Sequence, residues 1–286
     1  MTGAGPGERS ERSRAAHGRI VRAAIAGSKP GRELIDPREA MERDFFAEYA
    51  EIEDTHWWFR GRRAIFERLL GRLPALPRRR ILDIGFGTGA MLTFLRGYGE
   101  VVGMDRSAEA IRFARTRCDR PMFIGDIIDV PLRTGAVDLV TAFDILEHVD
   151  DDVAALAELA RVCRPGGYTL LTVPAFQFLW GNQDVISHHR RRYTSREFGR
   201  RVEAAGFRIA TLSYFNALLF PVVAAVRVAR RLRGAPHGPI KSDFTMTRLG
   251  LVNDALTGVF AAEGALLTRV RLPVGVSVVC LAERRA

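Results

Sequence analysis

The chain has 286 residues, of which 47% are hydrophobic and 27% charged, and its formal net charge is +10. This composition argues against a wholly disordered chain, and the length suits one α/β domain with additions or two small domains. The three cysteines, at 118, 163 and 280, are too few and too irregularly spaced for a disulfide framework or a zinc knot. We therefore expect a folded protein of the reducing cytoplasm.

Basic residues concentrate in the segments 9–32, 60–80, 190–192 and 227–233. Such clusters are typical of contacts with phosphates, anionic lipid headgroups or acidic substrates, and Arg-rich solvated surfaces explain them equally well. Residues 1–36 lack the apolar segment that a signal peptide requires. Their composition predicts a mobile basic tail.

Residues 36–73 show a helical pattern, with apolar residues three and four positions apart. After residue 80 the pattern changes to short apolar runs that alternate with amphipathic stretches. Strands are expected at 81–84, 101–104, 122–124, 137–143 and 168–173, and helices at 89–97, 108–117 and 151–163. This alternation predicts parallel βαβ units with right-handed crossovers.

A helix at 195–205, capped by Thr194 or Ser195, and a sixth strand at 207–214 continue the alternation. We interpret 37–286 as one α/β domain with additions. Its parts are N-terminal helices at 37–79, an α/β core at 80–214, a helical insertion at 215–272 and a last strand within 273–286.

The first strand of the core leads directly into a glycine-rich loop at 85–89 and then into a helix. Alternating glycines let the backbone turn tightly and approach a ligand at the carboxyl end of the strand. Nicotinamide-binding folds carry G-x-G-x-x-G in this place, a spacing that this loop lacks. Asp83, two residues before the loop, suits a cationic amino-acid ligand better than a pyrophosphate.

Acidic residues also end the next two strands. Asp105 ends the second strand, where a carboxylate can accept hydrogen bonds from both hydroxyls of a ribose. Asp126 follows the third strand, where it can accept from an adenine amino group while Ile127 covers the ring. These positions extend the predicted cofactor site along the carboxyl ends of the strands.

The motifs in 80–207 resemble, in order and spacing, those of class I S-adenosylmethionine-dependent methyltransferases, particularly the subgroup like the ubiquinone and menaquinone methyltransferases. The matching motifs are Leu-Asp-Ile-Gly-Phe-Gly-Thr-Gly at 82–89, Gly-Met-Asp at 103–105, Gly-Asp at 125–126, Leu-Glu-His-Val at 146–149 and Arg-Pro-Gly-Gly at 164–167. The resemblance implies a doubly wound, Rossmann-like sheet of seven strands, with the last strand antiparallel.

The resemblance also implies the cofactor, S-adenosyl-L-methionine, and how the core at 80–214 would bind it. The glycine loop and Asp83 would hold the methionine part, Asp105 the ribose and Asp126 the adenine end. The complete set of implied cofactor-binding residues is Asp83, Gly85, Phe86, Gly87, Thr88, Gly89, Asp105, Arg106, Asp126, Ile127, Phe143 and Asp144.

Four residues are candidates for catalysis. His148 follows the fourth strand, near the expected methyl acceptor, and is interpreted as a general base or as a structural cap. His188, His189 and Tyr193 lie on a long loop and could orient an acceptor hydroxyl or remove its proton, with the arginines at 190–192 binding phosphate or carboxylate. An exposed basic loop fits equally well. No metal is expected, because no Cys or Asp cluster completes a set of four zinc ligands.

The flanks of the core resemble bacterial methyltransferases often associated with glycan or lipid-linked biosynthesis. The resemblance rests on His-Trp-Trp-Phe at 56–59 with the arginines at 62–63, His-His-Arg-Arg-Arg-Tyr at 188–193 and Leu-Pro-Val-Gly-Val-Ser at 272–277. It suggests a glycan or lipid-linked substrate class. We predict a small-molecule, glycan or lipid-linked acceptor, with oxygen favoured over nitrogen and carbon. The aromatic residues at 57–59 are interpreted as core packing or as a lid, with core favoured.

Two rivals are an RNA methyltransferase and a protein that binds the cofactor without catalysis. The chain lacks the N/D-P-P-Y/F motif after its fourth strand, which disfavours a nucleic-acid substrate. Residues 215–233 combine an apolar body with a cationic end but are interrupted by Pro221 and Arg227, so they are too short to span a bilayer. They are interpreted either as an interfacial helix at the inner face of the membrane or as a helix packed on the domain or a dimer partner.

Overall fold

The computed structural model describes residues 43–232 and 250–286, with side chains at 49–229 and 250–286. The basic tail predicted at 1–36 lies outside the described residues. The same holds for the side chains of the arginines at 230, 231 and 233.

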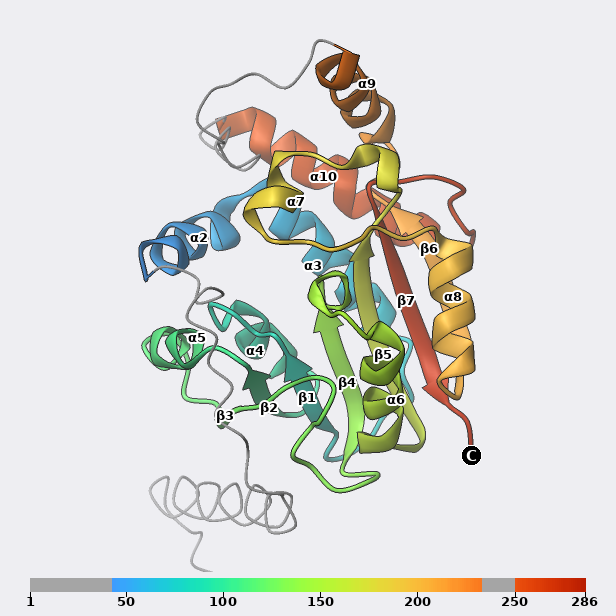
Figure 1. Cartoon of the computed structure of the whole chain (residues 1–286). Helices are drawn as coiled ribbons and strands as arrows, with labels where there is room; N and C mark the ends of the chain where they lie inside the picture. Colours follow the sequence, from blue (N-terminus) through green and yellow to red (C-terminus); the bar gives the residue numbers. More distant parts are fainter. Residues whose placement is uncertain (1–42, 233–249) are drawn as a thin grey trace, which may run out of the picture.

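The described residues form a seven-stranded sheet in the order β3-β2-β1-β4-β5-β7-β6 (Figure 1). Strand β7 runs antiparallel to β5 and β6, and the other pairings are parallel. This topology confirms the predicted Rossmann-like sheet with an antiparallel last strand. The strands are β1 (Arg80–Ile84), β2 (Glu100–Asp105), β3 (Met122–Ile124), β4 (Val137–Phe143), β5 (Cys163–Pro174), β6 (Phe207–Phe215) and β7 (Ser277–Arg284).

Helices cover both faces of the sheet and enclose two hydrophobic clusters. One cluster joins α6 and α8 to the sheet, and the other joins α3, α4, α5 and α10 to its opposite face. The described helices are α2 (Arg43–Thr55), α3 (Trp57–Leu70), α4 (Ala90–Leu95), α5 (Ala108–Ala114), α6 (Asp152–Val162), α7 (Asn182–Ile186), α8 (Ser195–Ala204), α9 (Phe220–Leu232) and α10 (Gly250–Leu267), with short 3-10 turns η1 (Leu146–His148) and η2 (Gln177–Leu179).

Side-chain caps explain where three core helices begin. Ser107 accepts a hydrogen bond from the backbone of Ala110 at 3.1 Å and begins α5, and Asp151 begins α6 in the same way. Thr194 rather than Ser195 caps α8. Each cap satisfies a backbone N–H group that the first turn of a helix leaves without a partner.

The helical pattern at 36–73 is divided into α2 and α3 at His56. The imidazole Nδ1 of His56 accepts a hydrogen bond from the backbone of Trp58 at 3.2 Å and caps α3. Trp57 and Trp58 pack against Phe260 of α10, with ring centroids 5.8 and 5.3 Å apart, and Phe59 is buried. These contacts favour the core interpretation of the aromatic cluster.

Helices α9 and α10 account for the described part of the insertion predicted at 215–272 (Figure 1). Pro221 lies in the first turn of α9, where a missing backbone N–H costs no helical hydrogen bond. Val222, Val226 and Val228 of α9 are exposed. Across the described ranges, no helix is both long and apolar enough to cross a membrane.

Candidate cofactor site

The glycine loop turns tightly at the carboxyl end of β1. Gly85 and Gly87 have φ angles of 72° and 52°, in the left-handed region that glycine adopts at little cost. A Cβ at Gly85 would clash with Ile145, so the loop packs directly against the chain that follows β4. Around Gly87, by contrast, no described atom lies within 4 Å of the position that a Cβ would occupy. This open space leaves room for a ligand close to the backbone.

Asp105 at the end of β2 is held toward the glycine loop. Its Oδ2 accepts a hydrogen bond from the backbone of Gly87 at 3.1 Å, and its Oδ1 accepts from Ser107 at 2.9 Å. Burial raises the pKa of Asp105, while these backbone hydrogen bonds lower it. A carboxylate has about four acceptor positions. Asp105 is thus fixed beside the glycine loop, where the sequence predicts a ribose contact.

Asp83 inside β1 has an acceptor that the protein leaves unused. Its Oδ1 accepts a hydrogen bond from the hydroxyl of Thr141 at 2.6 Å. Its Oδ2 is buried and has no hydrogen-bond partner among the described residues. Burial, followed by repulsion from Asp105 and Glu53, raises the pKa of Asp83 to about 7, although the Thr141 hydrogen bond lowers it. A cationic ligand group would stabilise the charged form of this carboxyl group.

Four more of the residues implied for the cofactor divide into two groups. Asp126 is half-buried after β3 and accepts a hydrogen bond from the backbone of Ile128 at 3.1 Å. Asp144 is half-buried after β4 and adopts a φ of 56°. Ile127 and Phe143 are buried instead, and Phe143 stacks on Phe66 with ring centroids 4.4 Å apart. The acids therefore lie at the edge of the sheet, while these apolar residues belong to the core.

The N-terminal helices contribute two residues that the sequence analysis did not assign to the site. Glu53 of α2 is buried and accepts a hydrogen bond from the Thr88 hydroxyl of the glycine loop. Arg62 of α3 forms an ion pair with Asp144, with 2.6 Å between Nη1 and Oδ2. The buried Nε of Arg62 has no hydrogen-bond partner in the described chain. Glu53 carried no sequence signal, and Arg62 appeared only in a flanking motif.

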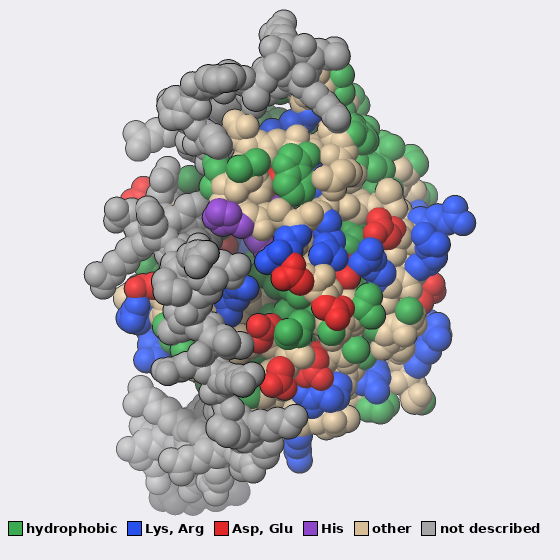
Figure 2. Space-filling view, viewed as in Figure 1, with side chains coloured by type: hydrophobic (Ala, Val, Ile, Leu, Met, Phe, Trp, Pro, Cys, Tyr) green, Lys and Arg blue, Asp and Glu red, His purple; other side chains and the backbone are tan. Residues whose placement is uncertain are grey.

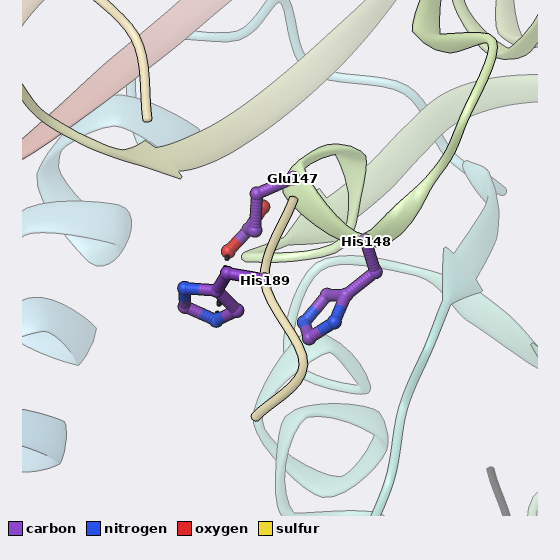
Figure 3. Close-up of side chains that lie close together, drawn as sticks. All are labelled: Glu147, His148 and His189. Carbon is purple, nitrogen blue, oxygen red and sulfur yellow. Dashed lines mark ion pairs between the residues drawn. The ribbon is translucent and has the colours of Figure 1, made fainter. Parts of the chain in front are cut away.

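Three side chains meet beyond the end of β4 (Figure 3). Glu147 and His148 come from η1, and His189 comes from the loop after α7. The rings of His148 and His189 meet edge to face, with centroids 4.7 Å apart. Burial, followed by the charges of His189 and Arg106, lowers the pKa of His148 to about 3, so its imidazole is neutral near pH 7.

Backbone contacts join the 188–193 loop to η1. Arg190 donates from its backbone N–H to the carbonyl of Glu147 and from its Nε to the carbonyl of His148, each at 2.8 Å. His189 is fixed by a hydrogen bond of 2.8 Å between its Nδ1 and Oδ1 of Asp184. The adjacent His188 is exposed and has a φ of 53°. The structure thus brings His148 and His189 together but leaves His188 at the surface.

Tyr193 is placed differently from the other candidates for catalysis. Its side chain is 1% exposed, and its hydroxyl donates a hydrogen bond to Oδ2 of Asp152 at 2.7 Å. Burial and the neighbouring Asp152 raise the pKa of Tyr193. This placement supports a structural role, in which Tyr193 ties the loop to α6.

The arginines at 190–192 face carboxylates of the protein itself. Arg192 forms a bidentate pair with Asp184, at 2.7 and 3.0 Å, and Arg190 and Arg191 lie against Asp150 and Asp152. Figure 2 shows arginine and acidic side chains next to one another on this face, beneath histidine side chains. Much of the positive charge of this loop is therefore balanced within the protein.

Comparison with known proteins places this geometry in a family. The family model of a methyltransferase domain matches residues 82–171. The chain is 31% identical over 183 residues to a malonyl-[acyl-carrier protein] O-methyltransferase of Serratia marcescens, covering 61% of this chain and 71% of that protein. The chain belongs to the S-adenosylmethionine-dependent methyltransferases. The predicted family and its cofactor are thereby confirmed.

Two other relatives match a similar share of the chain. It is 28% identical over 170 residues to a probable S-adenosylmethionine-dependent methyltransferase of Mycolicibacterium smegmatis, covering 58% of this chain and 65% of that protein. A 37.1 kDa protein in a transposon of Streptomyces fradiae is 31% identical over 180 residues, covering 56% of this chain and 52% of that protein. The chain thus spans about half to two thirds of the length of these two relatives.

Solved structures support the fold of the methyltransferase. A Haemonchus contortus phosphoethanolamine N-methyltransferase, in complex with phosphomonomethylethanolamine and S-adenosylhomocysteine, superimposes with a TM-score of 0.56 at 15% identity, covering 86% of this chain and 59% of that one. The YcgJ protein of Bacillus subtilis superimposes with a TM-score of 0.51 at 16% identity, covering 78% of this chain and 98% of that one. At such low identity the likeness concerns the fold alone.

Proposed function

We propose that the chain transfers a methyl group from S-adenosylmethionine to an oxygen atom of a small-molecule, glycan or lipid-linked acceptor. The observation that carries the proposal is the buried Oδ2 of Asp83, which has no partner among the described residues, in the strand that leads into the glycine loop. A buried carboxylate without a partner is costly unless a ligand supplies the opposite charge. The ammonium group of the cofactor would supply it.

The residues along the edge of the sheet fit the rest of the cofactor. Asp105 would accept from the ribose hydroxyls and Asp126 from the adenine, while Glu53 and Arg62 would close the N-terminal helices over the site. When bound, the cofactor supplies a methyl group on a positively charged sulfur that needs no further activation. The contribution of the protein is then mainly to position the acceptor and exclude water.

The choice of oxygen rests on relatives and on the loop beyond β4. Malonyl-[acyl-carrier protein] O-methyltransferases recur among the relatives, including one of Pectobacterium atrosepticum that is 37% identical over 103 residues. In this proposal His148 and His189 face the acceptor. A carboxylate acceptor is already ionised near pH 7 and would need no base.

Cofactor binding is tested by titration calorimetry of the full chain with S-adenosylmethionine and S-adenosylhomocysteine, with NAD as the negative control. We expect micromolar dissociation constants for the first two, corresponding to about −8 kcal/mol, and no heat with NAD. Binding of NAD alone would overturn the proposal.

A matched pair of variants tests the ribose contact. Asp105→Ala removes the carboxylate at the end of β2 and should abolish measurable cofactor binding. Asp119→Ala removes an exposed carboxylate on the loop between α5 and β3 and should bind as the unchanged chain does. Circular dichroism checks that both variants fold. Unchanged binding by folded Asp105→Ala would remove the ribose assignment.

A further inference from the structure

Glu147, His148 and His189 present a set of metal-binding atoms in one place (Figure 3). One ligand atom from each residue lies within 4.8 Å of the others. Two imidazoles and one carboxylate are the protein ligands of several catalytic zinc sites and of non-haem iron sites. The three residues come from two segments that are distant in the sequence.

Glu147 is the observation that points to a ligand. Its side chain is 0% exposed, and within the described part of the chain neither carboxylate oxygen has a hydrogen-bond partner. The imidazole Nε2 of His189 is 3.8 Å from Oε1 of Glu147, too far for a hydrogen bond. Buried charges in proteins are normally paired or bound to a metal. A cation between Glu147 and the two imidazoles would satisfy both oxygens.

The hydrogen bond from His189 to Asp184 fixes the tautomer that a metal ligand needs. Asp184 accepts hydrogen bonds from Arg192 at 2.7 and 3.0 Å and from the backbone of Gly181 at 2.7 Å. A carboxylate held by these donors acts as an acceptor, so Nδ1 of His189 carries the proton in its 2.8 Å bond to Asp184. The lone pair of Nε2 then lies on the side of Glu147. Carboxylates orient metal-binding histidines in the same way.

His148 is also held by its surroundings. The turn η1 fixes its backbone, since the backbone N–H of His148 donates a hydrogen bond to the carbonyl of Ile145 at 3.0 Å. The edge-to-face contact with His189 keeps the two rings adjacent. His189 is therefore oriented by Asp184, which lies outside the cluster, and His148 lies against His189.

We propose that Glu147, His148 and His189 bind one divalent transition-metal ion of the zinc class. In a tetrahedral zinc site the ligand atoms are about 3.4 Å apart, so the side chains must close by about 1 Å on binding. The two nitrogen ligands disfavour Mg²⁺ and Ca²⁺, which prefer oxygen. The sequence analysis expected no metal, because no Cys or Asp cluster completes four zinc ligands. The carboxylate of Glu147, from a distant segment, joins the histidines only in the folded chain.

Three protein ligands leave at least one coordination position open. η1 follows Ile145, which packs on Gly85 of the glycine loop, so the cluster lies next to the candidate cofactor site. The open position would take an oxygen of the methyl acceptor, a role that rests on the proposed function. Metal binding itself does not depend on that function and is measured without cofactor or acceptor.

The test uses the full chain freed of metal with a chelator and then dialysed. Co²⁺ is titrated and followed by visible absorption, and Zn²⁺ is then added to displace it. We expect one equivalent of Co²⁺ in a site of low coordination number, with the absorption lost when Zn²⁺ binds. Glu147→Gln, which keeps the shape of the side chain, and His189→Ala should each weaken Co²⁺ affinity at least tenfold. Asp184→Asn should weaken it by about 10- to 100-fold.

His188→Asn is the matched control, because Asn tolerates the positive φ of this exposed neighbour. It should bind Co²⁺ as the unchanged chain does. The absence of a Co²⁺ or Zn²⁺ complex in the folded unchanged chain would overturn the proposal. The proposal would also be overturned if Glu147→Gln and His189→Ala bound Co²⁺ with the same affinity as the unchanged chain, since the metal would then bind elsewhere. Cofactor titration on the same preparations separates a failed metal site from a failed methyltransferase assignment.

Discussion

Asp83 shows how a single buried acid makes the stability of the protein depend on pH. Its side chain is 1% exposed, and burial is the largest cause that raises its pKa from 3.8 to about 7. Between these two values the folded chain holds this proton more tightly than the unfolded chain does. The free energy of unfolding therefore falls as the pH rises from about 4 to about 7.

Asp83→Asn should remove this part of the pH dependence, because an amide carries no charge to bury. Between pH 5 and 8 we expect the unchanged chain to lose on the order of 1–4 kcal/mol through Asp83. Urea unfolding at four pH values in this range measures the effect. Asp119→Asn changes an exposed carboxylate, and its free energy of unfolding should decline with pH as much as that of the unchanged chain. If the free energy of unfolding of Asp83→Asn declined equally, the effect would belong to another buried acid, such as Glu53 or Glu147, whose pKa burial also raises.

The helix pair α3 and α10 packs closely where glycines leave room, and Gly61 is one of them. A Cβ at Gly61 of α3 would overlap the ring of Phe260, which is buried between the helices. Gly258 lies on the exposed side of α10, and no described atom is within 4 Å of the Cβ position there. The two glycines therefore separate the effect of close packing from the effect of helix propensity.

Gly61→Ala should destabilise the chain by about 1–3 kcal/mol, because the added methyl group overpacks the interface. Gly258→Ala should instead stabilise it by up to about 1 kcal/mol, because alanine favours the helix and restricts the unfolded chain. Chemical denaturation of both variants measures the difference. The same sign of change in both would mean that the α3 and α10 contact is looser than the structure indicates.

At the scale of the whole molecule, ligand binding connects the strand ends with the N-terminal helices. In the proposed cofactor site Asp83, Asp105 and Asp126 of the sheet would hold the ligand, and Glu53 of α2 and Arg62 of α3 contact Thr88 and Asp144 at the same edge. A ligand held by both parts stabilises the folded chain and not the unfolded one.

Saturating S-adenosylmethionine should therefore raise the melting temperature. At one hundred times the dissociation constant the stabilisation is about 2.7 kcal/mol, which corresponds to a rise of roughly 5–10 °C for a domain of this size. Differential scanning fluorimetry measures the rise, with NAD as control. In the Arg62→Ala variant, S-adenosylmethionine should raise the melting temperature by less than it does in the unchanged chain. Each rise is measured against the same protein without ligand. A full rise in Arg62→Ala would exclude α3 from the binding site.

Local sequence patterns predicted the parallel strands and the glycine loop, whereas the antiparallel last strand was expected only from the resemblance to a known family. Strand and helix periods are read from neighbouring residues, and the carboxyl ends of parallel strands meet at one edge. The positions of Asp83, Asp105 and Asp126 at that edge followed from this rule.

Only the tertiary structure decided which side chains meet across elements. Thr88 and Glu53 are 35 residues apart, Arg62 and Asp144 are 82 apart, and Glu147 meets His189 through a loop that no periodicity describes. Tyr193 was grouped with the histidines because it is near them in the sequence, yet its side chain points into the core. Such contacts depend on how helices and loops pack on the sheet, and this packing is set by the shapes of many residues at once rather than by any local motif.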